Sequence, residues 1–493
     1  MEGRGRLGVN PFQHGLRSGI GRWVRVNSMS IVCYGAFAIA YLTLSWAGAP
    51  HLIDNYPDSH TYLHVSFFGH AERLWTIPVV YFVGGTTAIR VTLQTLIGVA
   101  CWITLSVQLR RVVHNRVIRF VSQTLVLSIS LTAPILQWNR IVLSESIAIS
   151  LTVLLLAASL ALARRMDSRS MAAFLIAAVL WTFTRQVHAF ITVALAAPFA
   201  FVAWHRPEAR RLAVVGLAGV AFIGIWGTAT ALQTSSASPA GIATTNPTEV
   251  QVAGIIQFRA ITDPREMTFL WNHGLPHTSA LRSPPPFTTL GQPVNVTQFA
   301  DPYAEYRLAD DPAFKRWADR NGEAVFLKYL ITHPWSTISQ PLIHAPQLMT
   351  MNPDYIASPA LPPWASTLVY GNLKSISTPN APWGPPRSSD PIYLEVIVAF
   401  GAFLFFLAAL RRRLTRAMWV AAAALVVVAV WALAIWNFAA TELPREFIAP
   451  AVLVHLAVIV LIASSLDSLV GGGNQRKEAR AKIADQPDQV TLS

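Results

Sequence analysis

The chain has 493 residues, of which 53% are hydrophobic and only 13% are charged, whereas a soluble domain usually carries about 25% charged residues. This composition excludes an ordinary cytosolic enzyme and a disordered scaffold. The net charge of +13 does not indicate nucleic-acid binding, because the basic residues, 33 of them Arg, mostly form short clusters between apolar runs.

Ten apolar runs predict an all-α polytopic membrane bundle of about ten transmembrane helices. They cover residues 29–47, 90–108, 120–137, 142–163, 171–184, 187–204, 212–232, 392–410, 417–436 and 447–466. Residues 171–204 are divided because a single helix would measure about 51 Å, whereas the hydrocarbon layer is about 30 Å thick. Arg185 and His188 would also lie near the centre of that helix. Pro134 and the polar residues 137–140 divide the run 120–163 in the same way.

The arginine clusters predict how the bundle is oriented. If the spans alternate, every short cluster falls on one side, and such clusters remain in the cytosol. The clusters are Arg4–Arg25, Arg110–Arg119, Arg164–Arg169, Arg206–Arg211, Arg411–Arg416 and Arg476–Lys482. We therefore expect both termini in the cytosol, with residues 1–28 as a basic N-terminal segment and 467–493 as a disordered tail. The first run lacks a cleavage pattern and is expected to be a retained span.

Two segments are expected on the opposite side, between the bundle portions 29–232 and 391–466. They are the loop 48–89 and the segment 233–390, which holds 21 of the 32 prolines. We expect this segment to form a small, mixed, loop-rich extracytoplasmic domain, because Pro-rich stretches exclude regular helix and central strand. One part of it, 311–332, is expected to be helical, with Asp311 or its neighbour as the cap, Pro312 in the first turn and an apolar face.

A dense polar cluster follows the first span. Its carboxylates are Asp54 and Asp58, with His60 and Tyr62 close by. Asp58 and Tyr62 would share one helical face if the chain is helical after Pro57. A carboxylate at the membrane surface can act as a general base. The alternative is a solvated loop in which Pro57-Asp58 starts a helix.

Glu145 is a second candidate, because it lies about one turn inside the fourth apolar run. A carboxylate there is costly unless it is paired, hydrated or neutral, so we expect it to face the bundle. One interpretation is acceptor positioning, metal binding or stabilisation of a transition state. The other is a structural ion pair with Arg140 or Arg185.

The last outer turn contains Glu442 and Arg445, where the final span begins. A guanidinium at headgroup level can bind a phosphate through two parallel hydrogen bonds. Arg445 could also be an interfacial anchor or pair with Glu442. Arg185 is a second candidate for phosphate binding, with the same alternatives.

The thirteen histidines form no compact metal motif such as HExxH. A divalent cation held by His60, Asp58 or Glu145 fits the residue types, but their spacing does not establish one, and no other cofactor is expected. Trp335 is expected to be an interfacial or packing aromatic rather than a platform for a sugar.

The order of these features resembles the GT-C superfamily of integral-membrane glycosyltransferases. The shared features are the outer loop with Pro57-Asp58-Ser59, the span reopening at Ser144-Glu145, the break at Arg185 and the late turn ending in Arg445. The likeness is greatest to bacterial members that use polyprenyl-phosphate sugars, relatives of protein mannosyltransferases and lipid A aminoarabinose transferases. The excess of arginine is similar to that of actinobacterial proteins. The resemblance covers roughly 29–232 and 392–466.

The resemblance implies a role for each matching residue. Asp58 corresponds to the acid that acts as catalytic base or orients the acceptor, and Glu145 to an acid at the start of the fourth span. Arg445 corresponds to a basic residue linked to the lipid phosphate. Many members carry two adjacent acids in the first loop, whereas here Ser59 stands beside Asp58.

The implied reaction moves a sugar from a polyprenyl-phosphate donor to a glycan, lipid or protein acceptor on the outer face of the bacterial plasma membrane. A single displacement would invert the anomeric centre. Asp58 would act as the base, and Arg445 or Arg185 would stabilise the departing phosphate.

Other functions remain open at this point. A transporter or flippase for lipids or glycans would usually show repeated halves, which this sequence lacks. A glycan polymerase or ligase with a diphosphate-linked donor would depend on outer arginines and histidines rather than on Asp58. A catalytically inactive relative would have a structural role.

Overall fold

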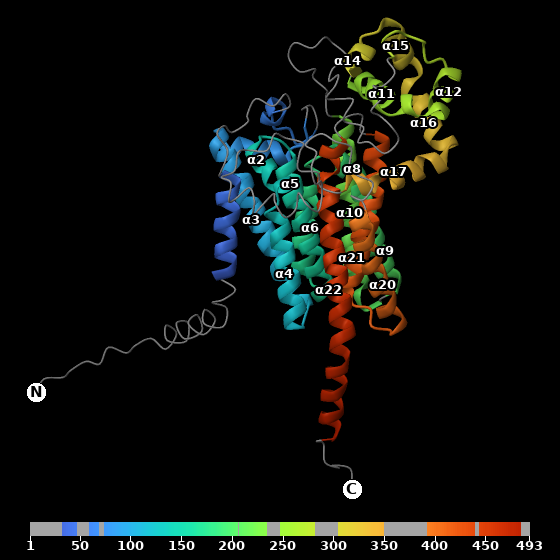
Figure 1. Ribbon diagram of the computed structural model, residues 1–493. Helices are drawn as coiled ribbons and strands as arrows, with labels where there is room; N and C mark the ends of the chain where they lie inside the picture. Colours follow the sequence, from blue (N-terminus) through green and yellow to red (C-terminus); the bar gives the residue numbers. More distant parts are fainter. Residues whose placement is uncertain are drawn as a thin grey trace, which may run out of the picture.

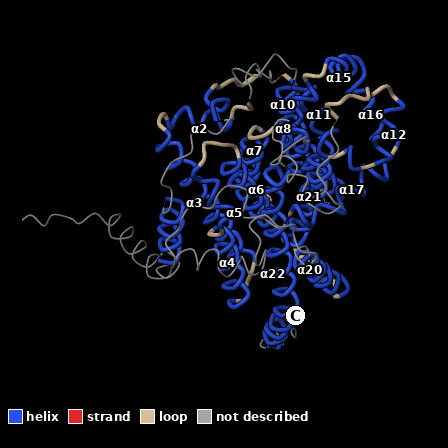
Figure 2. The backbone as a smooth tube through the Cα atoms, turned by 45° about the horizontal axis from the view of Figure 1, so that its top comes forward, coloured by secondary structure: helices blue, strands red, loops and turns tan. Residues whose placement is uncertain are grey.

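The computed structural model describes residues 32–46, 59–68, 73–205, 207–233, 247–281, 304–349, 392–438 and 443–484. Within these ranges the regular elements are all helices (Figure 2). They form a bundle of long helices and a smaller group of helices, residues 247–349, at one end of it (Figure 1). We call this smaller group the outer domain. The predicted all-α membrane bundle is confirmed at this level.

The bundle begins with the helix Val32–Trp46 and the short turn η1 (Ser59–Leu63). Its remaining helices up to the outer domain are α2 (Thr76–Gly84), α3 (Thr87–Val112), α4 (Arg116–Ser130), α5 (Ala133–Leu136), η2 (Gln137–Arg140), α6 (Glu145–Arg165), α7 (Ser168–Thr182), α8 (Gln186–Ile191), η3 (Thr192–Leu195), α9 (Ala196–His205), η4 (Pro207–Ala209) and α10 (Arg210–Leu232). After the outer domain it ends with α20 (Ile392–Leu410), α21 (Arg416–Phe438) and α22 (Leu443–Ala484).

Six stretches of helix are long and apolar enough to cross a membrane. They are Thr87–Val112, Glu145–Arg165, Gln186–Trp204, Pro207–Leu232, Arg416–Phe438 and Glu446–Val470. Each of the other four predicted runs also contains a helix, but its apolar part is shorter, as in Leu394–Leu410 of α20. For example, α4 has 15 residues, which corresponds to about 22 Å. The chain is therefore a helical membrane protein, and the total of ten crossings stays a prediction.

The two most buried helices, α6 and α22, form the centre of the bundle. Helix α6 packs against α3 and α7, and α22 packs against α21, α20 and α4. Where they meet the other helices, small residues such as Ala148, Ala157, Ala449 and Ala457 are fully buried. Small side chains allow close helix approach, which is the main source of association energy in lipid.

Both predicted divisions of long apolar runs are correct. Helix α7 ends at Thr182 and α8 begins at Gln186, and Arg185 lies between them with extended backbone angles. Between α4 and α6 the chain forms the short helices α5 and η2. These turns bring polar residues to the same end of the bundle as the outer domain (Figure 1).

The described part of the outer domain is helical, whereas the Pro-rich stretches on which the expectation of a mixed, loop-rich fold rests lie outside the described residues. Its elements are α11 (Pro247–Phe258), η5 (Ala260–Thr262), α12 (Pro264–Asn272), α14 (Ala304–Ala309), α15 (Pro312–Trp317), the π-helical turn η6 (Ala318–Gly322), α16 (Glu323–Thr332) and α17 (Pro334–Leu348). Four of these helices begin at a proline, where the missing N–H has no consequence because the first residues of a helix lack acceptors. These four prolines therefore mark helix starts.

The expected helix over 311–332 is confirmed as α15, η6 and α16 in succession. The Asp311 carboxylate accepts hydrogen bonds from the backbone N–H groups of Ala313 and Phe314, each at 2.9 Å. Phe314 and Trp317 are buried in the small core of the domain.

The expected disordered tail from residue 467 is wrong for its first part. Helix α22 continues to Ala484 without interruption. The segment 474–484 consists largely of residues with high helix propensity, such as Gln, Arg, Lys, Glu and Ala, which allow the last span to extend beyond its apolar part.

Replacing Asp311 by Ala removes the cap of α15 and is expected to weaken this helix by about 1 kcal/mol. Hydrogen exchange of the amides in α15, measured by mass spectrometry on the whole protein, should then be several times faster. Asp311→Asn keeps the acceptor oxygen and serves as the matched control with near-native exchange. Equal exchange in the Asp311→Ala variant and the native protein would contradict the cap.

Candidate functional site

Three charged side chains from distant parts of the chain meet at the end of the bundle that carries the outer domain. The Nη2 atom of Arg185 lies 2.9 Å from Oε1 of Glu145 and 2.8 Å from Oε1 of Glu446. Glu145 is fully buried and Arg185 nearly so, whereas the side chain of Glu446 is 25% exposed. We call these three residues the charge cluster.

Helix starts position the members of the charge cluster. Glu145 is the first residue of α6, Arg185 immediately precedes α8, and Glu446 lies in the first turn of α22. A negative charge is favoured at the start of a long helix, because unpaired N–H groups and the helix dipole make that end positive. The sequence therefore allows two carboxylates near the membrane rim, and the turn at Arg185 supplies the cation between them.

The arginine retains binding capacity in this arrangement. Among the described residues, its Nη1 atom has no hydrogen-bond partner, although it is buried. The two carboxylates hold the guanidinium through Nη2. A fixed guanidinium with a spare donor can bind an oxygen atom of a phosphate or a sugar.

An aromatic group surrounds His188, three residues after the arginine. His188 is fully buried, with its ring stacked on Trp181 at 4.4 Å between centroids and perpendicular to Trp431 at 4.6 Å. Its Nδ1 atom lies 2.6 Å from Oγ1 of Thr184. In the described part of the chain its Nε2 atom has no partner. In the sequence, His188 served only to divide a span. Its position three residues after Arg185 was the signal that could have marked it as part of the site.

The first outer loop is attached close to the charge cluster. The Ser59 hydroxyl donates a hydrogen bond of 3.0 Å to the carbonyl oxygen of Val142, three residues before Glu145. Tyr62 is buried, with its ring edge-on to Tyr81 and the Arg73 guanidinium 4.9 Å from its centroid. The predicted residues Asp54 and Asp58 lie outside the described residues. His60 lies in η1, and its side chain is not described.

Arg140 has a different partner from the one considered in the sequence. It donates hydrogen bonds of 2.8 Å to the carbonyl oxygens of Leu44 and Ser45, where the first helix ends. The last carbonyls of a helix lack partners within the helix, and a cation there is favoured by the helix dipole. Of the two arginines considered for Glu145, Arg185 is therefore the one that binds it.

The turn before α22 contributes a residue that sequence reasoning did not select. Glu442 lies outside the described residues, and Arg445 lies in the first turn of α22 with an undescribed side chain. The adjacent Glu446 is the residue that joins the charge cluster. An acid at the very start of the last apolar run was a signal of the same kind as Glu145.

The described residues contain no group of three or more His, Cys, Asp or Glu side chains that could hold a metal ion. Asp58 and the His60 side chain lie outside the described residues, so a divalent cation at the first loop stays a prediction.

A polar cavity of about 280 Å³ lies within the outer domain, between Glu249 of α11 and the segment 318–324. Burial, together with a hydrogen bond to Asp319 and the charge of Asp319, raises the pKa of Glu249 to about 7. Lys315 lies 3.8 Å from Oε2 of Glu249 and acts in the opposite direction. This side chain therefore titrates near neutral pH.

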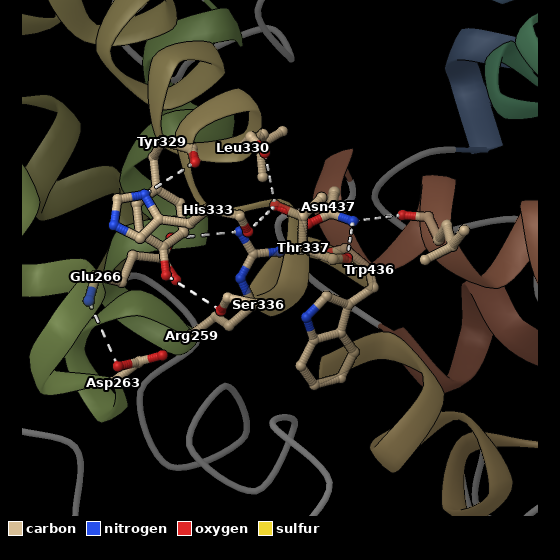
Figure 3. Close-up of polar contacts among 11 residues, drawn as sticks. Arg259, Asp263, Glu266, Tyr329, Leu330, His333, Ser336, Thr337, Trp436 and Asn437 are labelled. Atoms are coloured by element: carbon tan, nitrogen blue, oxygen red, sulfur yellow. Dashed lines mark hydrogen bonds and ion pairs between the residues drawn. The ribbon is translucent and has the colours of Figure 1, made fainter. Parts of the chain in front are cut away.

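Arg259 joins the outer domain to the bundle (Figure 3). Its guanidinium donates to the carbonyl oxygen of Trp436 near the end of α21 and lies 3.7 Å from Oε1 of Glu266. Beside this contact, the Asn437 side chain donates to the carbonyl oxygen of Thr337 at 3.2 Å. Burial lowers the pKa of Arg259 and raises that of Glu266. The outer domain is thus bound to the last turn of a spanning helix.

No family model, no curated protein and no solved structure matches this chain. The membership suggested by the motif order therefore stays a prediction, and the function has to be argued from the residues themselves.

Removing Arg185 alone would leave the buried carboxylate of Glu145 without its cation. We expect Arg185→Met to lower the stability by about 3–5 kcal/mol, the cost of breaking one half of a buried pair. The double variant Arg185→Met, Glu145→Gln removes both charges, so it should be more stable than Arg185→Met. Thermal unfolding in detergent measures this; a double variant less stable than Arg185→Met would contradict the coupling.

The raised pKa of Glu249 predicts that the stability of the protein depends on pH. Its pKa rises from 4.5 in the unfolded chain to about 7 in the folded protein, so the folded state binds the proton more tightly. Stability should therefore fall as the pH rises from about 4.5 to about 7 and change little above that. The difference in unfolding midpoint between the native protein and Glu249→Gln, recorded from pH 4.5 to 8, tests this. A difference that is constant across this range would rule out the assigned titration.

Proposed function

We propose that this chain is a membrane glycosyltransferase that moves a sugar from a polyprenyl-phosphate donor to a glycan, lipid or protein acceptor at the outer face of the plasma membrane. The observation that carries the proposal is Arg185, which is held by Glu145 and Glu446 at the rim of the bundle. Its Nη1 donor has no partner among the described residues.

The chemistry of such a donor fits this part of the molecule. The polyprenyl chain is soluble only in lipid, whereas the phosphate and sugar remain at the membrane surface. At that surface the protein offers a fixed guanidinium next to the N-terminal ends of two long helices, α6 and α22. The guanidinium favours a phosphate oxygen, while the helix starts stabilise the two carboxylates that hold it.

In the proposed reaction Arg185 holds the phosphate as it leaves. An acceptor hydroxyl oxygen attacks the anomeric carbon, the bond from that carbon to the phosphate oxygen breaks, and the phosphate departs with the electron pair. Asp58 accepts the proton of the hydroxyl, because an aspartate is ordinarily ionised at neutral pH. The hydrogen bond from Ser59 to Val142 supports this role, since it ties the residue after Asp58 to the segment leading to Glu145.

The positions of the arginine clusters support placing this reaction on the outer face of the membrane. Helices α3 and α6 end in the arginine pairs Arg110–Arg111 and Arg164–Arg165, away from the charge cluster. Arg416, at the start of α21, donates to the carbonyl oxygen of Ala163 at 3.2 Å, so its cluster lies at that same end. Basic clusters at one end favour a cytosolic location for it. We therefore propose ten crossings, both termini in the cytosol of a bacterial cell, and an extracytoplasmic outer domain.

The central position of Arg185 in the charge cluster favours a second candidate function. A glycan polymerase or ligase with a diphosphate-linked donor would also use Arg185, but would not require Asp58. The two functions therefore differ in the donor they accept and in their response to the loss of Asp58.

Sugar transfer from a polyprenyl-phosphate donor by the purified protein tests the proposal. We expect Asp58→Asn to reduce the rate by about 10²–10⁴, the contribution of a general base, while Asp310→Asn in the outer domain serves as the matched control with native activity. Arg185→Lys, which keeps the charge but loses the planar fork, should also be much slower. Undiminished transfer by Asp58→Asn would remove Asp58 from the mechanism. Transfer only from a diphosphate donor, lost in Arg185→Ala and kept in Asp58→Asn, would establish the second candidate.

A further inference from the structure

Helix α17 carries a row of large apolar side chains that nothing in the described part of the chain covers. Trp335 is 81% exposed, Ile343 is 62% exposed, and Ile338 and Leu342 are also exposed. Trp335, Ile338 and Leu342 are spaced by three and four residues, so they share one face of the helix. Ile331, at the end of α16, extends the same apolar surface with 76% exposure.

The other side of α17 is bound to the protein. The carbonyl oxygen of Thr337 accepts the hydrogen bond from Asn437, and the Thr337 hydroxyl lies 2.9 Å from the carbonyl oxygen of Leu330. Pro341 is buried, and α17 packs along α21 and reaches α22. The helix therefore has one face against the bundle and one apolar face that is open.

The contact with α21 fixes the height of α17 relative to the membrane. Asn437 and Phe438 form the end of α21, one of the six helices long and apolar enough to span. Phe438 is itself 54% exposed. Other large residues along the outer side of α21 are exposed too, such as Val426 at 63%. The apolar face of α17 thus continues the lipid-facing surface of the bundle at the level where α21 leaves the membrane. In Figure 1, α17 lies beside the upper end of the bundle, below the rest of the outer domain.

Water is an unfavourable neighbour for this surface. Several large side chains exposed together form an apolar patch of the kind that marks an interaction site. Tryptophan is enriched at the boundary between lipid and water, and an amphipathic helix at that boundary lies in the plane of the membrane. The continuity with α21 identifies lipid as the neighbour.

We infer that α17 is an interfacial helix whose face Trp335, Ile338 and Leu342 is immersed in the lipid leaflet at this end of the bundle. It holds the outer domain at the membrane surface from one side, while Arg259 and Asn437 hold it against α21.

Spin labels on the whole protein in lipid nanodiscs of phosphatidylethanolamine and phosphatidylglycerol test the inference. In a Cys33→Ser, Cys101→Ala background, single cysteines are introduced as Ile338→Cys and Leu342→Cys. Lys328→Cys, on the exposed side of α16, is the matched control for water, and Val426→Cys on α21 is the control for lipid. Collision rates with oxygen, which is concentrated in lipid, and with a water-soluble nickel chelate give the depth of each label.

We expect the labels at positions 338 and 342 to collide preferentially with oxygen, at a depth of about 5–10 Å in the headgroup–acyl boundary. The label at 328 should collide preferentially with nickel. If 338 and 342 behave like 328, the face is in water and the inference fails. If both reagents are excluded from them while the label at 426 still meets oxygen, another protein surface covers α17 and the inference also fails.

Discussion

A carboxylate that is fully buried at the end of an apolar bundle has to be paired, because water is not there to stabilise its charge. In this protein the carboxylate is Glu145, and its partner Arg185 comes from the break between α7 and α8. Arg185 also binds Glu446 at the start of α22. One guanidinium therefore holds together three segments of the chain, and its two partners lie 40 and 261 residues away from it in the sequence.

This pairing determines how the ends of the helices are arranged. Helices α6 and α22, the two most buried in the bundle, must start at the same level, because both carboxylates reach one arginine. The segment before α6 is held by further hydrogen bonds: Gln94 donates to the carbonyl oxygens of Asn139 and Ile141. The polar rim is thus rigid on the side of the bundle where the first outer loop, the last turn and the outer domain all attach. Such rigidity suits a site that has to hold a charged headgroup in a fixed position.

Much of the bundle follows from the length and polarity of its apolar runs. A run too long for the membrane and interrupted by Arg185 has to be two helices, and the structure has a break at that residue. The partner of Glu145 was harder to predict. Arg140 is nearer in the sequence, but the turn after α5 directs it to the end of the first helix. Which of two arginines binds a carboxylate depends on the tertiary arrangement of the helices. The spacing of the residues along the chain does not reveal that arrangement.

Proline has two opposite effects on helices, and the outer domain shows one of them. At Pro264 and Pro312 it occupies the first position of a helix, after a capping aspartate. The same residue type stops a helix in its interior and starts one at its N-terminus, so composition alone does not separate the two cases. The sequence predicts the start at Asp311-Pro312, and the same dipeptide at Asp263-Pro264 is a signal of the same kind.

The attachment of the outer domain also has a mechanical consequence. Arg259 binds the backbone of Trp436 and Asn437 binds the backbone of Thr337, so two neighbouring residues of α21 contact two separate segments of the domain. Two adjacent attachment points restrict rotation of the domain relative to α21 more than a single point would. A change in bilayer thickness can tilt or rotate a spanning helix. If α21 tilts or rotates, the outer domain would therefore move together with it.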